Sequence, residues 1–274
     1  MGYVIFNGRL IAENQAQLFI NDLAIVRGYG VFDFFKTVNG KALFIEDNLD
    51  RFYQSASFMN LPVVYSREEV KQLISQLMVV NNMPESGIKM LLTGGYSADG
   101  YSIAEPNFII SQQSIKRNMI EEQQGLKLMM YDYQRPFSRV KTIDYVMGIQ
   151  AMKLARSKGA DDVLFSKDGR ISECPRANFF LVNSEGVLIT AEEGVLEGVT
   201  RKKILEVAKE NDLKVEQRAV GLKDLKYASE AFITSTTKNI TPITNILGFK
   251  NFGDGAGQIT KRLQDLWQEL IYEK

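Results

Sequence analysis

One lysine in this sequence stands just before a helix, a position from which an amine could do covalent chemistry. Lys141 follows the basic, loop-like stretch "RPFSR" and precedes apolar residues spaced as in an amphipathic helix. A lysine that forms a Schiff base must be uncharged part of the time, and burial or nearby cations lower its pKa. Arg135 and Arg139 could supply that cationic field. Lys141 is therefore a candidate for covalent chemistry, and a solvated surface lysine is the alternative.

The sequence of 274 residues contains no histidine. This excludes Ser-His-Asp and Cys-His nucleophilic systems, zinc sites with histidine ligands and acid–base catalysis by imidazole. An enzyme with this composition must move protons on Lys, Glu, Asp, Tyr or Cys, or must bind a cofactor that helps. The single cysteine, Cys174, excludes an internal disulfide. Because no histidine can activate it and its neighbours are apolar, we interpret Cys174 as a packing residue rather than a nucleophile.

Three segments have the chemistry to bind a phosphate. Gly198 immediately precedes a helix whose free N–H groups attract anions, and Thr200 is expected to supply an N-cap hydroxyl there. The stretch "TSTTKN", residues 234–239, offers hydroxyls and N–H groups in a turn after a strand. Arg51 lies on an otherwise apolar helix, where a guanidinium usually needs an anion. An ordinary capped helix, a Ser/Thr turn and a solvated arginine are the respective alternatives.

One glutamate enters an apolar strand. Glu173 lies between Ser172 and the sequence "CPRANFF". A half-buried carboxylate at such a position needs a cationic or N–H partner. The alternative is a surface glutamate at the beginning of a strand.

The elements that must position these residues alternate between strands and helices. The first half predicts hairpins that turn at Asn-Gly, residues 7–8 and 39–40, helices over 45–61 and 67–83, and strands over 87–95 and 107–115. The second half predicts further strands and hairpins, with helices over 144–159, 198–212 and 258–274. The class is α+β, with a small N-terminal α/β domain (1–112), a polar linker (113–125) and a larger C-terminal domain (126–274).

Composition limits the partners and the location. The formal net charge is zero, so nothing in the charge balance favours nucleic acid or an acidic membrane surface. No apolar run approaches the ~20 residues that a membrane span requires, and the N-terminus lacks the pattern of a secretory signal. We therefore expect a cytoplasmic protein that binds small molecules, without metal.

Six motifs occur in an order that resembles one family: "RGYGVFDFFKTVNGK", "NLDRFYQSA", "VKTIDYV", "ISECPRANFFLV", "EGVTRKKILEVA" and "TSTTKNITPI". The chain resembles the class IV aminotransferases, the fold type IV enzymes that use pyridoxal 5′-phosphate (PLP), from about Tyr3 to Trp267. This resemblance implies a two-lobed fold whose larger C-terminal domain is a pseudo-barrel. It also implies a homodimer, in which the segment from Arg27 to Phe32 helps to close the substrate pocket across the interface.

The resemblance assigns a role to each candidate residue. Lys141 matches the lysine that holds PLP as a Schiff base, and Glu173 matches the carboxylate that holds the pyridine nitrogen. The implied activity exchanges an amino group between an amino acid and a 2-keto acid with ping-pong kinetics. The remaining matches are the phosphate ligands Arg51, Val199, Thr200 and Thr236, the cofactor neighbour Ser235, and Thr237 and Lys238 in the loop facing the substrate carboxylate.

Departures from the family pattern bear on the substrate. Asn48 stands where the family usually has a histidine, and Arg176 stands where many members have a small residue. Relative to the branched-chain enzymes, Arg27 replaces a tyrosine and Lys89 replaces an arginine. We hypothesise that the three cations surround the substrate, which favours glutamate and 2-oxoglutarate as one pair, with a D-amino acid or a branched-chain substrate as the other partner. Two alternatives stay open. One is an aminodeoxychorismate lyase, which eliminates pyruvate to give 4-aminobenzoate, and the other is a non-catalytic PLP-binding module.

Overall fold

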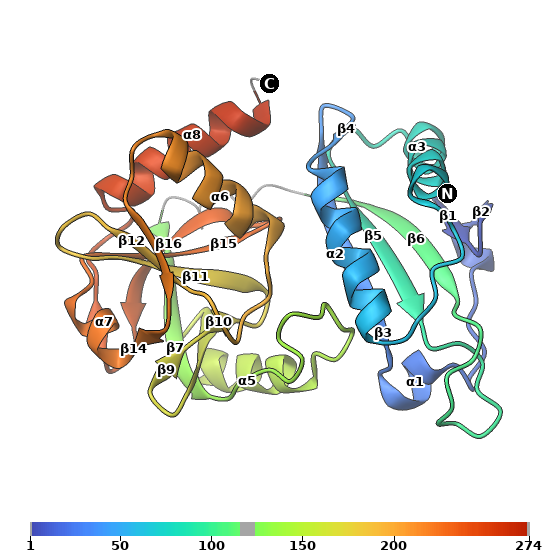
Figure 1. The fold of residues 1–274 in the computed structure, drawn as a ribbon, viewed down its shortest axis with the longest axis horizontal. Coiled ribbons are helices and arrows are strands. Elements are labelled where there is room, and N and C mark those ends of the chain that lie inside the picture. The colour runs from blue at the N-terminus through green and yellow to red at the C-terminus, as the bar shows by residue number, and fades with distance from the viewer. Residues whose placement is uncertain (1, 116–123, 273–274) are drawn as a thin grey trace. The chain divides into compact units, whose positions relative to one another are not determined.

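The computed structural model describes residues 2–115 and 124–272 (Figure 1). The chain divides into two compact units: Met1–Lys116 with Val140–Asp144, and Arg117–Arg139 with Tyr145–Lys274. Most of the predicted linker lies outside the described residues, and its first two residues, 113 and 114, belong to the last strand of the first unit.

The first unit is built on an antiparallel sheet of six strands in the order β2-β1-β6-β5-β3-β4. Both predicted Asn-Gly hairpins are confirmed. The central residues of each turn have positive φ, at Asn7-Gly8 and at Asn39-Gly40, as a type I′ turn requires. The strands are β1 (Tyr3–Phe6), β2 (Arg9–Ala12), β3 (Gly30–Val38), β4 (Lys41–Ala42), β5 (Ser86–Thr93) and β6 (Phe108–Ser114).

Two helices, α2 (Ile45–Phe58) and α3 (Arg67–Asn81), lie beside this sheet (Figure 1). Their buried apolar residues belong to the core of the unit. Both helices were predicted. A capping box formed by Ser66 and Glu69 begins α3, because each side chain bonds the other residue's N–H. The sequence reasoning missed the short helices η1 (Glu13–Gln15) and α1 (Leu23–Arg27), which are too brief to show a period.

The segment that carries Lys141 corrects the predicted boundary of the larger domain. Val140–Asp144 belongs to the first unit, because it pairs with the beginning of β3 on the side where β4 pairs only with the end of that strand. The Phe32 N–H donates to the Lys141 carbonyl at 2.9 Å, and the Ile143 N–H donates to the Gly30 carbonyl at 3.1 Å. Pairing between residues so far apart in the sequence leaves no local signal.

The second unit contains a mixed sheet in the order β13-β12-β11-β15-β16-β7-β8-β9-β14, with β10 beside β11 and β17 beside β16. Most neighbours are antiparallel, and β12–β13, β16–β7 and β7–β8 are parallel. This is the nearly closed pseudo-barrel that was predicted. The strands are β7 (Leu126–Asp132), β8 (Asp162–Lys167), β9 (Arg170–Ile171), β10 (Glu173–Cys174), β11 (Ala177–Val182), β12 (Leu188–Ala191), β13 (Val215–Arg218), β14 (Val220–Gly221), β15 (Glu230–Ser235), β16 (Asn239–Ile246) and β17 (Lys250–Asn251).

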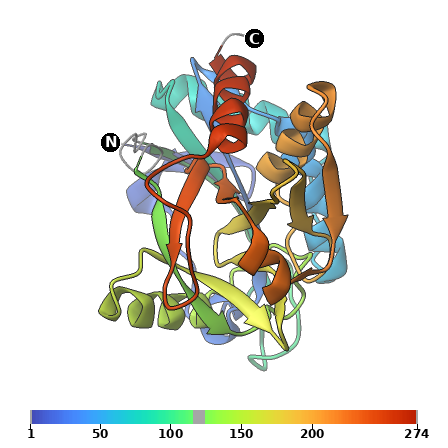
Figure 2. The same cartoon turned by 90° about the vertical axis from the view of Figure 1, so that its left-hand side faces the viewer.

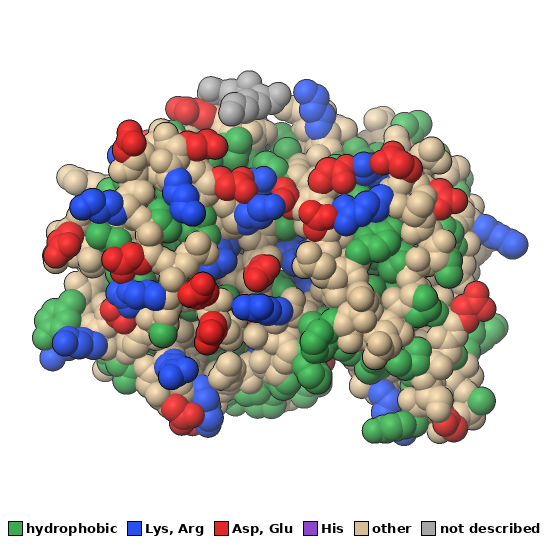
Figure 3. Space-filling model, viewed as in Figure 1, with side chains coloured by type: hydrophobic (Ala, Val, Ile, Leu, Met, Phe, Trp, Pro, Cys, Tyr) green, Lys and Arg blue, Asp and Glu red, His purple; other side chains and the backbone are tan. Residues whose placement is uncertain are grey.

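The helices of the second unit are α5 (Val146–Ser157), α6 (Val199–Glu210), α7 (Leu222–Tyr227) and α8 (Gln258–Tyr272). Of these, α5, α6 and α8 were predicted and are confirmed. The C-terminal helix α8 lies against β15 and β16 (Figure 2). The described residues contain no helix long and apolar enough to cross a membrane. On the face shown in Figure 3, Lys and Arg side chains alternate with Asp and Glu, in keeping with the zero net charge.

Candidate active site

Lys141 is held by its backbone at both ends. Its N–H donates to the Ser55 hydroxyl of α2 at 3.1 Å, and its carbonyl accepts the Phe32 N–H. The ammonium lies 4.6 Å from the centroid of the Phe32 ring, within the range of a cation–π contact. Ser55 is buried and Lys141 is half-buried. The position of the Lys141 backbone is thus fixed far more firmly than that of a solvated surface lysine.

The register of the first sheet places Phe32 and Lys89 on the same face as Lys141. Residues directly opposite one another in an antiparallel ladder share a face. Val31 and Thr142 form such a pair and face the core under α2, so Lys141 and Phe32 face away from it. Lys89 lies opposite Phe34, two residues along β3 from Phe32, and is exposed on that same face.

Arg27, the other predicted substrate residue of this unit, lies off the sheet. It is the last residue of α1 and is exposed, and its Nη1 donates to the carbonyl of Val26 at 2.9 Å. The structure therefore brings Phe32 and Lys89 to the Lys141 face and does not bring Arg27 there.

Arg51 has a partner within the chain that the sequence reasoning did not foresee. Its Nε and Nη2 each donate to a different oxygen of Asp33, both at 2.8 Å, and Nη2 also reaches the Asn48 Oδ1 at 3.3 Å. Asp33 is completely buried in β3. A carboxylate within the apolar run "VFDFF" was the available signal, since a buried charge needs a counter-ion.

We expect the Arg51→Ala variant to lower the free energy of unfolding of the cofactor-free protein by roughly 3–5 kcal/mol, because Asp33 would be left buried without its counter-ion. The measurement is urea unfolding. Arg67→Ala is the control, because its ion pairs with Glu46 and Asp50 are exposed and should contribute about 0–1 kcal/mol. Equal stability of the Arg51 and Arg67 variants would contradict this role.

Glu173 is a buried carboxylate surrounded by donors. Oε1 accepts Arg135 Nε at 3.2 Å and Nη2 at 3.0 Å. Oε2 accepts the Leu196 N–H at 2.9 Å and Asn178 Nδ2 at 3.3 Å. Arg135 also donates to the Ser138 carbonyl. The surface alternative for Glu173 is therefore wrong, because the side chain is buried and partnered as a negatively charged acceptor.

Asn178 connects Glu173 to the beginning of α6. It lies opposite Glu173 on one side and opposite Thr234 on the other, so the three side chains share a face of the sheet. Its Nδ2 donates to the Leu196 carbonyl at 2.8 Å, and a Cβ added to Gly198 would lie 2.0 Å from its Oδ1. Only glycine allows this close approach. The start of α6 therefore lies directly against Asn178, on the face of the sheet that also carries Glu173 and Thr234.

The prediction that Thr200 caps α6 is wrong. The N-cap is Gly198, no side chain caps the helix, and Thr200 is the second helical residue, buried in the first turn. Within the described residues, the Val199 and Thr200 N–H groups donate to no acceptor. A helix start whose N–H groups lack acceptors is a suitable anion site, and Gly198 precedes the helix as predicted.

The turn between β15 and β16 carries the remaining candidates. Ser235 pairs with Asn239, so Thr236, Thr237 and Lys238 form the turn that was predicted. Ser235 Oγ accepts the Lys238 N–H at 3.1 Å. Thr237 is exposed, whereas Ser235 and Thr236 are half-buried.

Two of the predicted substrate cations lie near a buried acid of the second unit. The Lys238 ammonium lies 3.7 Å from the carboxylate of Asp162, which is 2% exposed. Burial raises the pKa of Asp162, and the charges of Lys238 and Arg176 act against that rise. Arg176 itself is exposed. The charge of Lys238 thus has a counter-ion within the chain.

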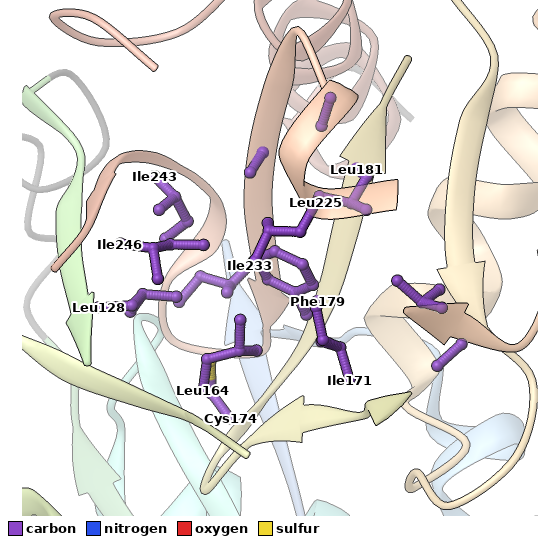
Figure 4. Close-up of a cluster of buried hydrophobic side chains, with 14 of the residues drawn as sticks. Leu128, Leu164, Ile171, Cys174, Phe179, Leu181, Leu225, Ile233, Ile243 and Ile246 are labelled. Atoms are coloured by element: carbon purple, nitrogen blue, oxygen red, sulfur yellow. The ribbon is translucent and has the colours of Figure 1, made fainter. Parts of the chain in front are cut away.

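Cys174 packs in the core of the second unit, beside Leu164 (Figure 4). Burial, reinforced by the charge of Asp162, raises the pKa of its thiol well above the ordinary value. This supports the interpretation of Cys174 as a packing residue, because the thiolate is the nucleophilic form.

We expect the Cys174 thiol of the native protein to react with a thiol reagent at least about 100-fold more slowly than in denaturant. The unfolded thiol ionises near pH ~8.5 while the native thiol keeps its proton, so the unfolded state binds fewer protons above that pH. The free energy of unfolding should therefore fall with rising pH, by up to ~1.4 kcal/mol per pH unit. Cys174→Ala should remove this slope, and rapid labelling of the native protein would contradict burial.

Comparison with known proteins defines the class. The family model described as "Amino-transferase class IV" matches residues 30–246. D-alanine aminotransferase of Listeria monocytogenes serotype 1/2a (strain 10403S) is 28% identical over 277 residues, covering 98% of this chain and 96% of that protein. Branched-chain-amino-acid aminotransferase of Pseudomonas aeruginosa is 28% identical over 289 residues, covering 100% of this chain and 94% of that protein.

A solved structure agrees in fold. The branched-chain amino acid aminotransferase from Escherichia coli superposes with a TM-score of 0.88 at 24% identity, covering 98% of this chain and 94% of that one. This protein belongs to the class IV aminotransferase family, whose members use PLP. The family, the fold and a PLP-dependent aminotransferase activity were predicted from sequence and are confirmed.

The residues present fit this cofactor. A phosphate needs N–H and hydroxyl donors, which the first turn of α6 and the β15–β16 turn both offer. A protonated pyridine nitrogen needs a charged acceptor, which Glu173 offers. The buried Thr234 hydroxyl, in the row with Glu173, has no hydrogen-bond partner within the described residues.

Proposed function

We propose that this aminotransferase works through Lys141 and transfers amino groups between a D-amino acid or branched-chain amino acid and a 2-keto acid, with glutamate and 2-oxoglutarate as one pair. The observation that carries the proposal is the fixed backbone of Lys141, bonded to Ser55 and Phe32, with its amine over the Phe32 ring. The match to the family motif around "VKTIDYV" supports the same role.

In this proposal Lys141 Nζ holds the cofactor aldehyde covalently, and Glu173 holds the pyridine nitrogen. The bound cofactor supplies an electron sink that stabilises negative charge at the substrate Cα. Arg135 and the Leu196 N–H donate to the Glu173 carboxylate and hold its orientation. The phosphate ligands are Arg51, Val199, Thr200 and Thr236, with Ser235 beside the cofactor.

Lys141 also moves the proton. When its amine is not bonded to the cofactor, Lys141 would take the proton from the substrate Cα and return it during the second half of the cycle. The Phe32 ring beside the amine restricts where it can point. This assignment explains how a chain without histidine carries out proton transfer at neutral pH.

The substrate proposal rests on the cations. Phe32 and Lys89 lie on the face of the sheet that carries Lys141. Along this face the apolar ring of Phe32 comes first after Lys141, and the positive charge of Lys89 comes next. That order suits a substrate with a short aliphatic stem and a distal carboxylate. Thr237 and Lys238 form the part of the turn assigned to the substrate carboxylate, and Arg27 and Arg176 are further candidate anchors.

We further propose a cytoplasmic homodimer. Exposed apolar side chains gather around α1 in the first unit, with Ile20 and Tyr101 more than 80% exposed, at 85% and 81%. The segments that contain Ile20 and Tyr101 are adjacent, because the rings of Phe19 and Tyr96 are in contact, with centroids 5.0 Å apart. A second copy covering this surface would account for the exposure. Analytical ultracentrifugation at micromolar concentration tests the dimer directly, and a monomer would reject it.

The test of the function is spectral. Purified protein loaded with PLP is mixed with separate L- and D-amino acids, and the absorbance of the cofactor is followed through its conversion to the aminated form. We expect conversion by D- or branched-chain amino acids and by glutamate, reversed by 2-oxoglutarate. No conversion by any amino acid would indicate a binding module. Release of pyruvate from aminodeoxychorismate without a keto acid would indicate the lyase.

Replacement of Lys89 by alanine is expected to raise the KM for 2-oxoglutarate by about tenfold or more with little change in kcat, because a charge-assisted hydrogen bond would be lost. Pyruvate, which lacks the distal carboxylate, is the control substrate and should keep its KM. Arg27→Ala and Arg176→Ala are measured in parallel, with bound PLP quantified. An unchanged KM in a given variant would reject that residue as an anchor.

A further inference from the structure

The β15–β16 turn is supported by residues that belong to other elements. Within the turn, Ser235 accepts the Lys238 N–H, and the Thr241 hydroxyl donates to the Lys238 carbonyl at 2.6 Å. These bonds close the turn locally. They do not by themselves fix its direction relative to the rest of the second unit.

The first outside support comes from α8. Trp267 is 2% exposed, and its indole N–H donates to the Asn239 Oδ1 at 3.1 Å. Asn239 ends the turn with φ of 50°, a left-handed conformation that asparagine tolerates better than most residues. Gln264, one turn earlier on α8, donates to the Ile240 carbonyl at 2.9 Å. The C-terminal helix thus holds the residue that ends the turn.

The second outside support comes from β8. The buried Asp162 lies at the start of this strand, and its carboxylate faces the Lys238 ammonium at 3.7 Å. Asp162 Oδ1 also accepts the Val163 N–H at 2.9 Å, which fixes the orientation of the carboxylate. Arg176 is a further charged group that acts on Asp162. Glu173 and Asp162 both act on the buried thiol of Cys174. The Lys238 side chain is 20% exposed, so the pair lies partly out of water and is held more firmly than a surface ion pair.

We propose that Asp162 and Trp267 are positioning residues for the cofactor: they hold the turn of Thr236, Thr237 and Lys238 in the conformation in which Thr236 binds the phosphate. The inference rests on the proposed role of Thr236. It also gives the Lys238 side chain a structural role: its ammonium forms an ion pair with Asp162 that holds the turn, instead of binding the substrate. Asp162 contacts Lys238 and Trp267 contacts Asn239, so in this proposal each acts through the geometry of the turn rather than as a phosphate ligand.

The test compares the affinity of the cofactor-free protein for PLP and the 31P chemical shift of the bound phosphate. Trp267→Phe removes the indole N–H and keeps most of the packing, and Asp162→Asn removes the charge and keeps the shape. We expect each variant to weaken PLP binding by about three- to tenfold and to move the 31P resonance. Asn239→Gly keeps the positive φ and removes the side chain that carries the acceptor, so it should reproduce the Trp267 effect even if Trp267→Phe folds poorly.

The controls separate this inference from the proposed function. Glu269→Gln on the exposed side of α8 and Asp168→Asn in the exposed turn after β8 should leave affinity and 31P shift unchanged. Thr236→Ala should weaken binding in its own right. If Thr236→Ala weakens binding while the Trp267, Asn239 and Asp162 variants match the parent, the positioning role is overturned and the phosphate site stands. If Thr236→Ala changes neither reading, the phosphate role fails and the inference fails with it.

Discussion

Replacement of Lys141 by alanine is expected to lower kcat by at least about 1,000-fold, because in the proposed function Lys141 is both the covalent attachment and the base that moves the Cα proton. The fold should survive, since the hydrogen bonds to Ser55 and Phe32 use only the backbone of Lys141. Steady-state kinetics and the far-UV circular dichroism spectrum measure the two effects separately.

The position of the attachment can be established chemically. Borohydride reduction of the loaded protein followed by peptide mapping should place the label on Lys141. Lys153→Ala, which changes an exposed lysine of α5, is the control and should match the parent in rate and labelling. A label on another lysine, or normal turnover by the Lys141 variant, would remove the basis of the proposed function.

Glu173→Gln is expected to lower kcat by roughly 100- to 1,000-fold. Glutamine keeps an oxygen for the Leu196 N–H but lacks the negative charge that, in the proposed function, holds the protonated pyridine nitrogen. It also leaves Arg135, only 13% exposed, without its counter-ion, so stability should fall as well. Steady-state kinetics of the PLP-loaded enzyme measure kcat, and urea unfolding of the cofactor-free protein measures the free energy of unfolding.

A double variant distinguishes catalysis from stability. Glu173→Gln with Arg135→Met removes both charges, and we expect it to recover much of the lost stability, because no unpaired charge stays buried. Its kcat should remain as low as that of Glu173→Gln. Recovery of kcat together with stability would mean that the carboxylate acts only through the fold. Glu185→Gln, on an exposed turn, is the neutral control.

The buried charges show where sequence reasoning about the site stopped. Arg51 and Glu173 were each expected to need a partner, and each has one, but the partners Asp33 and Arg135 were not identified. They lie 18 and 38 residues away in the sequence. A pattern of side-chain types shows that a charge must be neutralised, whereas the choice of partner depends on which strands become neighbours.

The sequence by itself determined the hairpins at Asn7-Gly8 and Asn39-Gly40, the main helices and the class of chemistry, because turn conformation and helical periodicity are properties of neighbouring residues. The absence of histidine required another proton carrier or a cofactor, and the order of the motifs resembled that of a family that uses PLP. Only the tertiary structure placed Lys141 on the edge of β3, where its N–H meets a serine 86 residues earlier in the chain. Only the structure showed that Gly198, not Thr200, caps α6, since backbone geometry decides which residue stands at the cap.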